Sequence, residues 1–300
     1  MTPRHAGPRA ADLRRLIEAR HARFLAELQA AERSPGVQAV HRTRVAARSL
    51  RSLLATLKPA LRPTLFARSR RDLRNMAVEL EEVREADVRR SWLAALARES
   101  GVLTPGAGRA LVVELERERD AARRRLRKHL RSQAYHERTL RLAATLSDRR
   151  LVPGDVDAAK VVHRRLARRW KRLRRALAAR VDDPQALHEL RLAAKHARYA
   201  SEALMPLLGI EAPRELKALR SLQDCLGEHR DATEAGEWLA GLGEPLGPVL
   251  LRRLEGPIEQ VKERRLRELD RLAARFTEPR LVPPAVSPAR RRAAARSARS

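Results

Sequence analysis

The sequence has one cysteine and no long apolar run, and each shortage excludes a class of protein. Cys225 is the only thiol in 300 residues, so the chain has neither a disulfide framework nor a cysteine-rich zinc site, which fits a reducing compartment. No uninterrupted apolar run approaches the roughly 20 residues that a membrane helix needs. The N-terminal residues MTPRHAGPRAADLRR contain no apolar core of a secretory signal. We therefore expect a soluble, cytoplasmic protein that does not contact membranes.

Acidic residues are too few to balance the basic ones. The chain carries 65 Lys and Arg residues against 37 Asp and Glu residues, a net charge of +28. Such a charge opposes a compact monomer by self-repulsion and attracts polyanions, so nucleic acid, anionic membrane and phosphate polymers are all candidate partners at this stage. A high Arg and Ala content also arises from base composition alone, so charge by itself identifies no partner.

Helical periodicity runs through nearly all of residues 10–276, and no convincing alternating strand appears. The dipeptides Ser-Pro at 34–35 and Asp-Pro at 183–184 each combine an N-cap residue with an N1 proline. The helices that they open are expected to end before Pro59 and Pro206, because the residue before a proline avoids the α region. The sequence predicts an all-α fold.

The sequence repeats itself at about half its length. Residues 40–59, VHRTRVAARSLRSLLATLKP, match residues 187–206, LHELRLAAKHARYASEALMP, at an offset of 147 residues. Residues 70–96 match residues 216–242 at an offset of 146. An internal duplication of a four-helix unit explains both matches best.

This duplication predicts the domain organisation. We expect two tandem four-helix units, residues 10–147 and 156–277, which together make one domain of residues 10–277. The last residues, 278–300, are rich in arginine and proline and predict a disordered basic tail.

Each matched stretch carries one histidine and three cations on one helix face. These residues are His41, Arg44, Arg48 and Arg51 in the first copy and His188, Arg191, Lys195 and Arg198 in the second. At about 100° per residue each set lies within about 80° of arc, opposite leucines and alanines. Arginine forks and lysine charges suit phosphate oxygens, and histidine adds a further donor. Because no acidic residue lies among them, the pattern favours a repeating anion over internal ion pairing.

A basic face opposite an apolar face is also what a solvated, arginine-rich helix shows. The same phase occurring twice favours binding, and if the two helices face each other, their cations line one basic groove or channel between the units. Weaker candidates for the wall are Arg71, Arg74, Lys217 and Arg220, for which a solvated face is an equal explanation. Tyr199 lies on the cationic side and offers one hydrogen bond, whereas Arg84 and Arg230 lie beside acids and indicate structural ion pairs.

The paired histidine helices resemble the two signature helices of the CHAD family, the conserved-histidine α-helical domain. Residues 222–239, LQDCLGEHRDATEAGEWL, resemble the family's second motif, a Leu-Gly pair followed by Arg-Asp. The first copy of this motif, LEEVREADV at 80–88, departs from it, because Glu81 and Glu85 replace the expected Gly and Asp. The resemblance covers about residues 10–276 and includes the tandem four-helix layout.

The resemblance implies a stand-alone family member that binds inorganic polyphosphate in a basic channel between its halves and is associated with polyphosphate granules. It places this binding on the eight residues of the two cationic faces. The residues themselves contain no Walker-type phosphate loop and no arrangement typical of a nucleophile with its base. We therefore expect no enzymatic activity, no metal ligands and no cofactor.

Nucleic acid is the main alternative ligand, since phosphate neutralisation favours DNA or RNA as readily as polyphosphate. Aromatic residues make up only 3% of the chain, so stacking platforms for single strands are scarce. The basic tail remains a candidate for nonspecific nucleic-acid binding. A scaffold that docks an acidic partner is the third reading, and exposed apolar anchors for it are scarce. The sequence indicates no oligomeric state.

Overall fold

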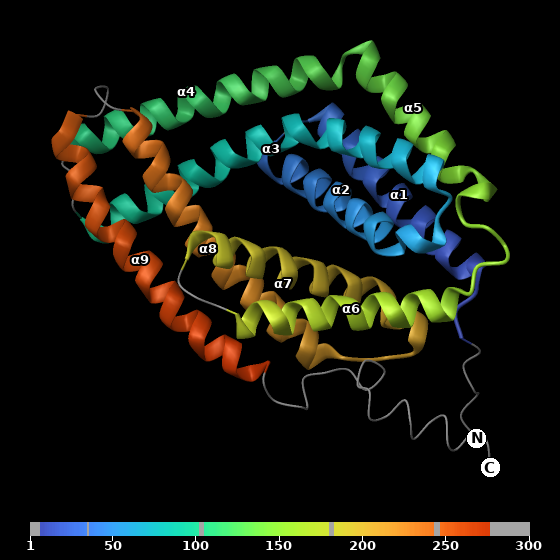
Figure 1. The fold of residues 1–300 in the computed structure, drawn as a ribbon. Helices are drawn as coiled ribbons and strands as arrows, with labels where there is room; N and C mark the ends of the chain where they lie inside the picture. The colour runs from blue at the N-terminus through green and yellow to red at the C-terminus, as the bar shows by residue number, and fades with distance from the viewer. Residues whose placement is uncertain (1–6, 35, 102–104, 180–182, 243–246, 277–300) are drawn as a thin grey trace.

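A computed structural model describes residues 7–34, 36–101, 105–179, 183–242 and 247–276 (Figure 1). All regular structure in these ranges is helical, which confirms the all-α prediction. The α-helices are α1 (Ala10–Arg33), α2 (Val37–Leu57), α3 (Pro63–Ser100), α4 (Pro105–Leu130), α5 (Gln133–Ser147), α6 (Ala158–Ala178), α7 (Pro184–Leu204), α8 (Pro213–Leu242) and α9 (Gly247–Arg275). Short 3₁₀ helices are η1 (Lys58–Ala60), η2 (Arg149–Leu151) and η3 (Pro206–Leu208). Within the described ranges no helix is both long and apolar enough to span a membrane.

The start of α7 confirms one predicted cap, and the start of α2 corrects the other. The Asp183 carboxylate accepts a hydrogen bond from the Ala186 backbone N–H at 2.9 Å, with Pro184 at the first helical position. In contrast, α2 begins at Val37 with Gly36 as its N-cap, so the prediction of a Ser-Pro start was wrong. Ser34 instead ends α1, because its backbone N–H donates to the Ala30 carbonyl at 3.0 Å.

The segment predicted as the first four-helix unit contains five described helices, α1 to α5. The chain breaks between α4 and α5 at Ser132, whose hydroxyl accepts from the Tyr135 N–H at 3.3 Å and donates to the His129 carbonyl at 2.7 Å. This cap separates α5 from α4 and gives the segment one helix more than the four that the sequence predicted. The second segment has the expected four helices, α6 to α9. The division into two repeated units stays a prediction, and the predicted tail lies outside the described residues.

Buried apolar side chains form three clusters in the described part of the chain. The first lies mainly between α1, α2, α3 and α5, also takes in side chains of α4, α6 and α7, and includes Leu13, Leu50, Leu73 and Leu142. The second joins α6 to α9 and includes Trp170, Leu190, Leu219 and Leu269. The third includes Leu93, Leu111, Leu239 and Leu254. It packs the C-terminal part of α3 and the N-terminal part of α4 against the C-terminal part of α8 and the N-terminal part of α9 (Figure 1). The two halves of the chain therefore share apolar contacts in the first and third clusters.

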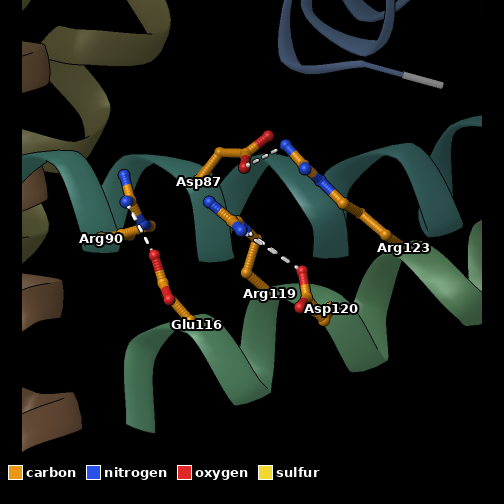
Figure 2. A network of polar contacts seen from close by, with 6 residues as sticks. All are labelled: Asp87, Arg90, Glu116, Arg119, Asp120 and Arg123. Carbon is orange, nitrogen blue, oxygen red and sulfur yellow. Dashed lines mark hydrogen bonds and ion pairs between the residues drawn. The ribbon is translucent and has the colours of Figure 1, made fainter. Parts of the chain in front are cut away.

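Ion pairs also join α3 to α4 (Figure 2). The Arg123 Nη2 atom lies 3.1 Å from Asp87 Oδ1, and the Arg90 Nη2 atom lies 2.9 Å from Glu116 Oε1. The two pairs differ in burial, since the Asp87 side chain is only 9% exposed whereas that of Glu116 is 43% exposed. A buried pair that loses one partner leaves an uncompensated charge, and an exposed pair does not.

We expect Asp87→Ala to lower the free energy of unfolding by about 3 kcal/mol, because it leaves the Arg123 guanidinium without its carboxylate in a mostly buried position. Urea unfolding followed by helical circular dichroism measures this loss. The matched control is Glu116→Ala, which removes the more exposed pair on the same two helices and is expected to cost less than about 1 kcal/mol. Equal losses in the two variants would contradict the role given to Asp87.

Candidate anion-binding site

A cavity of about 1040 Å³ is lined by residues of α2, α3, α7 and α8. Helix α2 contacts α7 and α3 contacts α8, so each pair brings one helix from each half of the chain. Residues that line the cavity from the cationic faces are His41, Arg44 and Arg48 of α2 and His188, Arg191, Lys195 and Arg198 of α7. The cations that the sequence places far apart are therefore brought together, and their role in binding stays a prediction.

The apolar faces of α2 and α7 explain why these cations point into the cavity. Leu50, Leu54 and Leu57 of α2 and Leu190 and Leu204 of α7 are at most 1% exposed and pack in the core clusters. A helix that buries one face directs the opposite face outward. Val45 and Leu192, which flank the cationic faces, also line the cavity.

The remaining candidates are divided by the structure. Tyr199 lines the cavity and is 7% exposed, with the Arg198 guanidinium 4.6 Å from its ring centroid. Arg51 is not among the lining residues and has an exposed side chain, unlike its match Arg198. The weaker candidates also are exposed and do not line the cavity; they are Arg71, Arg74, Lys217 and Arg220. Arg220 instead lies 3.4 Å from Glu202.

The cationic faces do form internal ion pairs, which corrects the expectation that they would not. Arg44 Nη1 donates to Glu81 Oε1 at 2.8 Å, and Arg48 Nη2 lies 3.9 Å from the same oxygen. Arg198 lies 3.5 Å from Glu202, one turn further along α7. Glu81 belongs to α3, so only the packing of α3 against α2 brings its carboxylate to these arginines.

Burial and repulsion between cations lower the pKa values of four cavity residues, which are His41, Arg44, Arg191 and Lys195. Loss of hydration lowers the pKa of Lys195 to about 7, and Arg48 and Arg191 add to the shift while Glu81 opposes it. Loss of hydration likewise lowers the pKa of Arg44 to about 10, with Arg48 acting in the same direction. The pKa of His41 is lowered by burial first and then by Arg44 and Arg84. The cavity therefore holds cations at a cost that a bound anion would relieve.

Helices α3 and α8 add charged lining residues that the sequence did not predict for the site, and two of them, Arg84 and Arg230, were expected to form structural ion pairs instead. These are Glu81, Arg84, Glu85 and Arg89 of α3 and Asp224, Glu228, Arg230, Asp231, Glu234 and Glu237 of α8. Burial raises the pKa of Asp231 and of Glu85 above their usual values. The charged lining residues recur three or four positions apart on each helix, so the sequence could have predicted that α3 and α8 each present one charged face to the cavity. The predicted ion pairing holds for Arg230, which pairs with Glu234.

A smaller cavity of about 420 Å³ adjoins the first near the beginning of α2. The two share His41, Arg84 and Asp231 among their lining residues. Across the part of the chain that the structure describes, no group of His, Cys, Asp and Glu residues is placed to hold a metal ion.

Comparison with known proteins places the chain among similar folds. In a structure search it matches PptA from Streptomyces chartreusis with a TM-score of 0.72 and 23% identity, covering 90% of this chain and 99% of that one. It also matches the CHAD domain from the plant Ricinus communis with a TM-score of 0.68 and 22% identity, covering 91% and 93%. None of the curated proteins that were compared is a match. The family model of the CHAD domain matches residues 8–240, and the chain therefore belongs to the CHAD domain family.

Proposed function

We propose that this protein binds inorganic polyphosphate in the cavity between α2, α3, α7 and α8. The observation that carries the proposal is that two helices from different halves of the chain direct their cations into one shared space. Arg48 and Arg191 both depress the pKa of Lys195, so charges from both helices act on the same region. A linear polymer with a negative charge at every phosphate matches such a two-sided set of donors. Family membership agrees with this ligand.

The surroundings of the cavity favour polyphosphate over nucleic acid. A nucleic-acid duplex is wider than its own major groove, which is about 12 Å across. It is therefore too wide to enter a cavity of about 1040 Å³. Single strands are held by bases stacked on aromatic rings. The lining contains one tyrosine and one tryptophan ring, and an arginine guanidinium stacks on each of them. Arg198 lies 4.6 Å from the ring centroid of Tyr199, and Arg89 lies 5.0 Å from that of Trp238. Those ring faces are occupied by guanidinium groups, which leaves phosphate contacts as the main source of affinity.

The proposal is binding without conversion of the polymer. Arginines neutralise the carboxylates of the cavity that form ion pairs, which are Glu81, Glu228 and Glu234. Glu85 and Asp231, whose pKa values burial raises, are placed to take up protons as a polyanion enters, which reduces their repulsion with it. In the cell, this activity would place the protein at polyphosphate granules. Incubation with polyphosphate is expected to release no orthophosphate.

We expect the double variant with Arg48→Gln and Arg191→Gln to lose at least about 100-fold in affinity for long-chain polyphosphate. It removes one charge-assisted donor from each helix, and each is worth about 1.5–3 kcal/mol. Fluorescence titration at physiological salt measures the affinity, with single-stranded RNA and duplex DNA of matched phosphate content as competitors. Wild-type protein should prefer polyphosphate to both competitors.

The matched control carries Arg71→Gln and Lys217→Gln, which remove the same charge from exposed positions outside the cavity. It is expected to keep affinity within about threefold of wild type. A chain shortened to end at residue 276 should also keep its preference for polyphosphate. If the control variant loses as much affinity as the cavity variant, or if the shortened chain loses the preference, net charge or the tail explains binding and the cavity does not.

Polyphosphate affinity is also expected to fall as pH rises from 7 to 9. The pKa of Lys195 is lowered to about 7 in the free protein, chiefly by burial, and a bound polyanion raises it again. Binding therefore takes up a proton above pH 7, and affinity decreases where the free lysine has lost its charge. Lys195→Arg keeps the charge over this range and should show a smaller decline. The same decline in both proteins would assign the pH dependence to other groups.

A further inference from the structure

Glu81 occupies a central position among the cavity cations. Its Oε1 atom accepts a hydrogen bond from Arg44 at 2.8 Å and lies 3.9 Å from Arg48. Its charge also raises the pKa values of Arg51 on α2 and Lys195 on α7, against the effect of burial. One carboxylate therefore interacts with cations from both helices, as a phosphate group of a ligand would.

The matching position on the other half of the chain has no side chain. At the offset of 146 residues Glu81 matches Gly227 of α8, which lines the same cavity. A Cβ atom added at Gly227 meets nothing within 4 Å, so open space lies beside the backbone at this position. Asp231 and Glu234 act on Arg191 only at longer range, and within the described ranges Arg191 forms no ion pair. The two sides of the cavity therefore differ in the charge that they offer a ligand.

In the ion pair of Arg44 with Glu81, the burial of the two side chains indicates that a ligand phosphate can replace the Glu81 carboxylate. The Arg44 side chain is 8% exposed and needs an anion beside it, because an unpaired buried charge is strongly unfavourable. The Glu81 side chain is 47% exposed and reaches water in the cavity, so it leaves the pair at little cost in hydration. A phosphate oxygen supplies the same charge-assisted hydrogen bond to Arg44.

We propose that Glu81 is an internal counter-ion that holds the phosphate position between Arg44 and Arg48 and thereby confines short phosphate chains to the α7 side of the cavity. This inference rests on the proposed function. A short chain binds beside Arg191 and Lys195, which form no ion pair among the described residues, whereas on α2 it would have to displace Glu81 from Arg44. A long chain gains contacts on both sides, and those contacts offset the displacement of Glu81. Glu81 is thus a determinant of chain-length specificity.

Binding of tripolyphosphate and of long-chain polyphosphate to the full-length protein, measured by isothermal titration calorimetry, tests the proposal. Glu81→Gln keeps an acceptor for Arg44 but removes the competing charge, so it should tighten tripolyphosphate binding about tenfold. Gly227→Glu adds a carboxylate beside the α7 cations and should weaken tripolyphosphate binding about tenfold. Gly227→Ala, which adds only a methyl group, is the control and should stay within about twofold of wild type.

The outcomes separate this proposal from the function on which it rests. If wild-type protein binds long-chain polyphosphate but neither charge variant alters tripolyphosphate affinity relative to its control, Glu81 is a structural ion pair and the inference is wrong. Weaker tripolyphosphate binding by Glu81→Gln in a folded protein has the same meaning. If Glu81→Gln does not fold, the comparison of Gly227→Glu with Gly227→Ala decides alone. Failure of wild-type protein to bind long-chain polyphosphate contradicts the proposed function itself.

Discussion

Repulsion between the cations of α2 and α7 is the force that the rest of the structure has to offset. Arg48 lowers the pKa values of both Arg44 and Lys195, and Arg191 adds to the effect on Lys195. These helices nevertheless contact each other, because their opposite faces bury leucine and alanine. Helix α2 packs in the first apolar cluster, and α7 packs in the second and, through Ala203 and Leu204, also in the first. Burial of apolar surface is worth about 25 cal/mol per Å². The third cluster, between the far parts of α3, α4, α8 and α9, holds the halves together without contact between the cations.

Carboxylates from α3 and α8 provide the second compensation, and they do so unequally. Glu81 pairs directly with Arg44, whereas Arg191, the matching residue of α7, is influenced by Asp231 and Glu234 only at longer range. The unequal pairing follows from one change of residue type between matched positions, from Glu81 to Gly227. A structure in which every cation had its own carboxylate would be more stable and would bind anions less well. Eight Lys and Arg residues line the cavity against seven Asp and Glu residues, so the net charge of the lining is small. What the cavity offers an anion is the group of cations on α2 and α7, of which Arg191 and Lys195 form no ion pair among the described residues.

Local patterns predicted what depends on local physics. Helical period and phase were enough to assign the all-α class and to separate the cationic face of α2 from its buried face, because both follow from residue spacing. The pairing of Arg44 with Glu81 joins residues that are far apart in sequence, and only helix packing determines it. Likewise, the phase of Arg51 placed it with Arg48, yet it is not among the residues that line the cavity. The extra helix of the first half begins at a side-chain cap on Ser132, which separates α5 from α4 and which helical periodicity alone does not reveal.

Stability and binding are opposed in this cavity, and the opposition has a thermodynamic consequence. The lowered pKa values of Arg44, Arg191 and Lys195 mean that the folded protein holds these groups in charged form less favourably than water does. An anion that enters the cavity removes part of that cost, so the free energy spent on assembling the cations returns as binding free energy. By linkage the ligand must then stabilise the fold, by about 2.7 kcal/mol at a free concentration of 100 times the dissociation constant. Repulsion between the cations lowers the free energy of unfolding of the ligand-free protein, and the same repulsion would favour tight binding of a polyanion. By pairing with Arg44, Glu81 reduces that repulsion in the ligand-free protein.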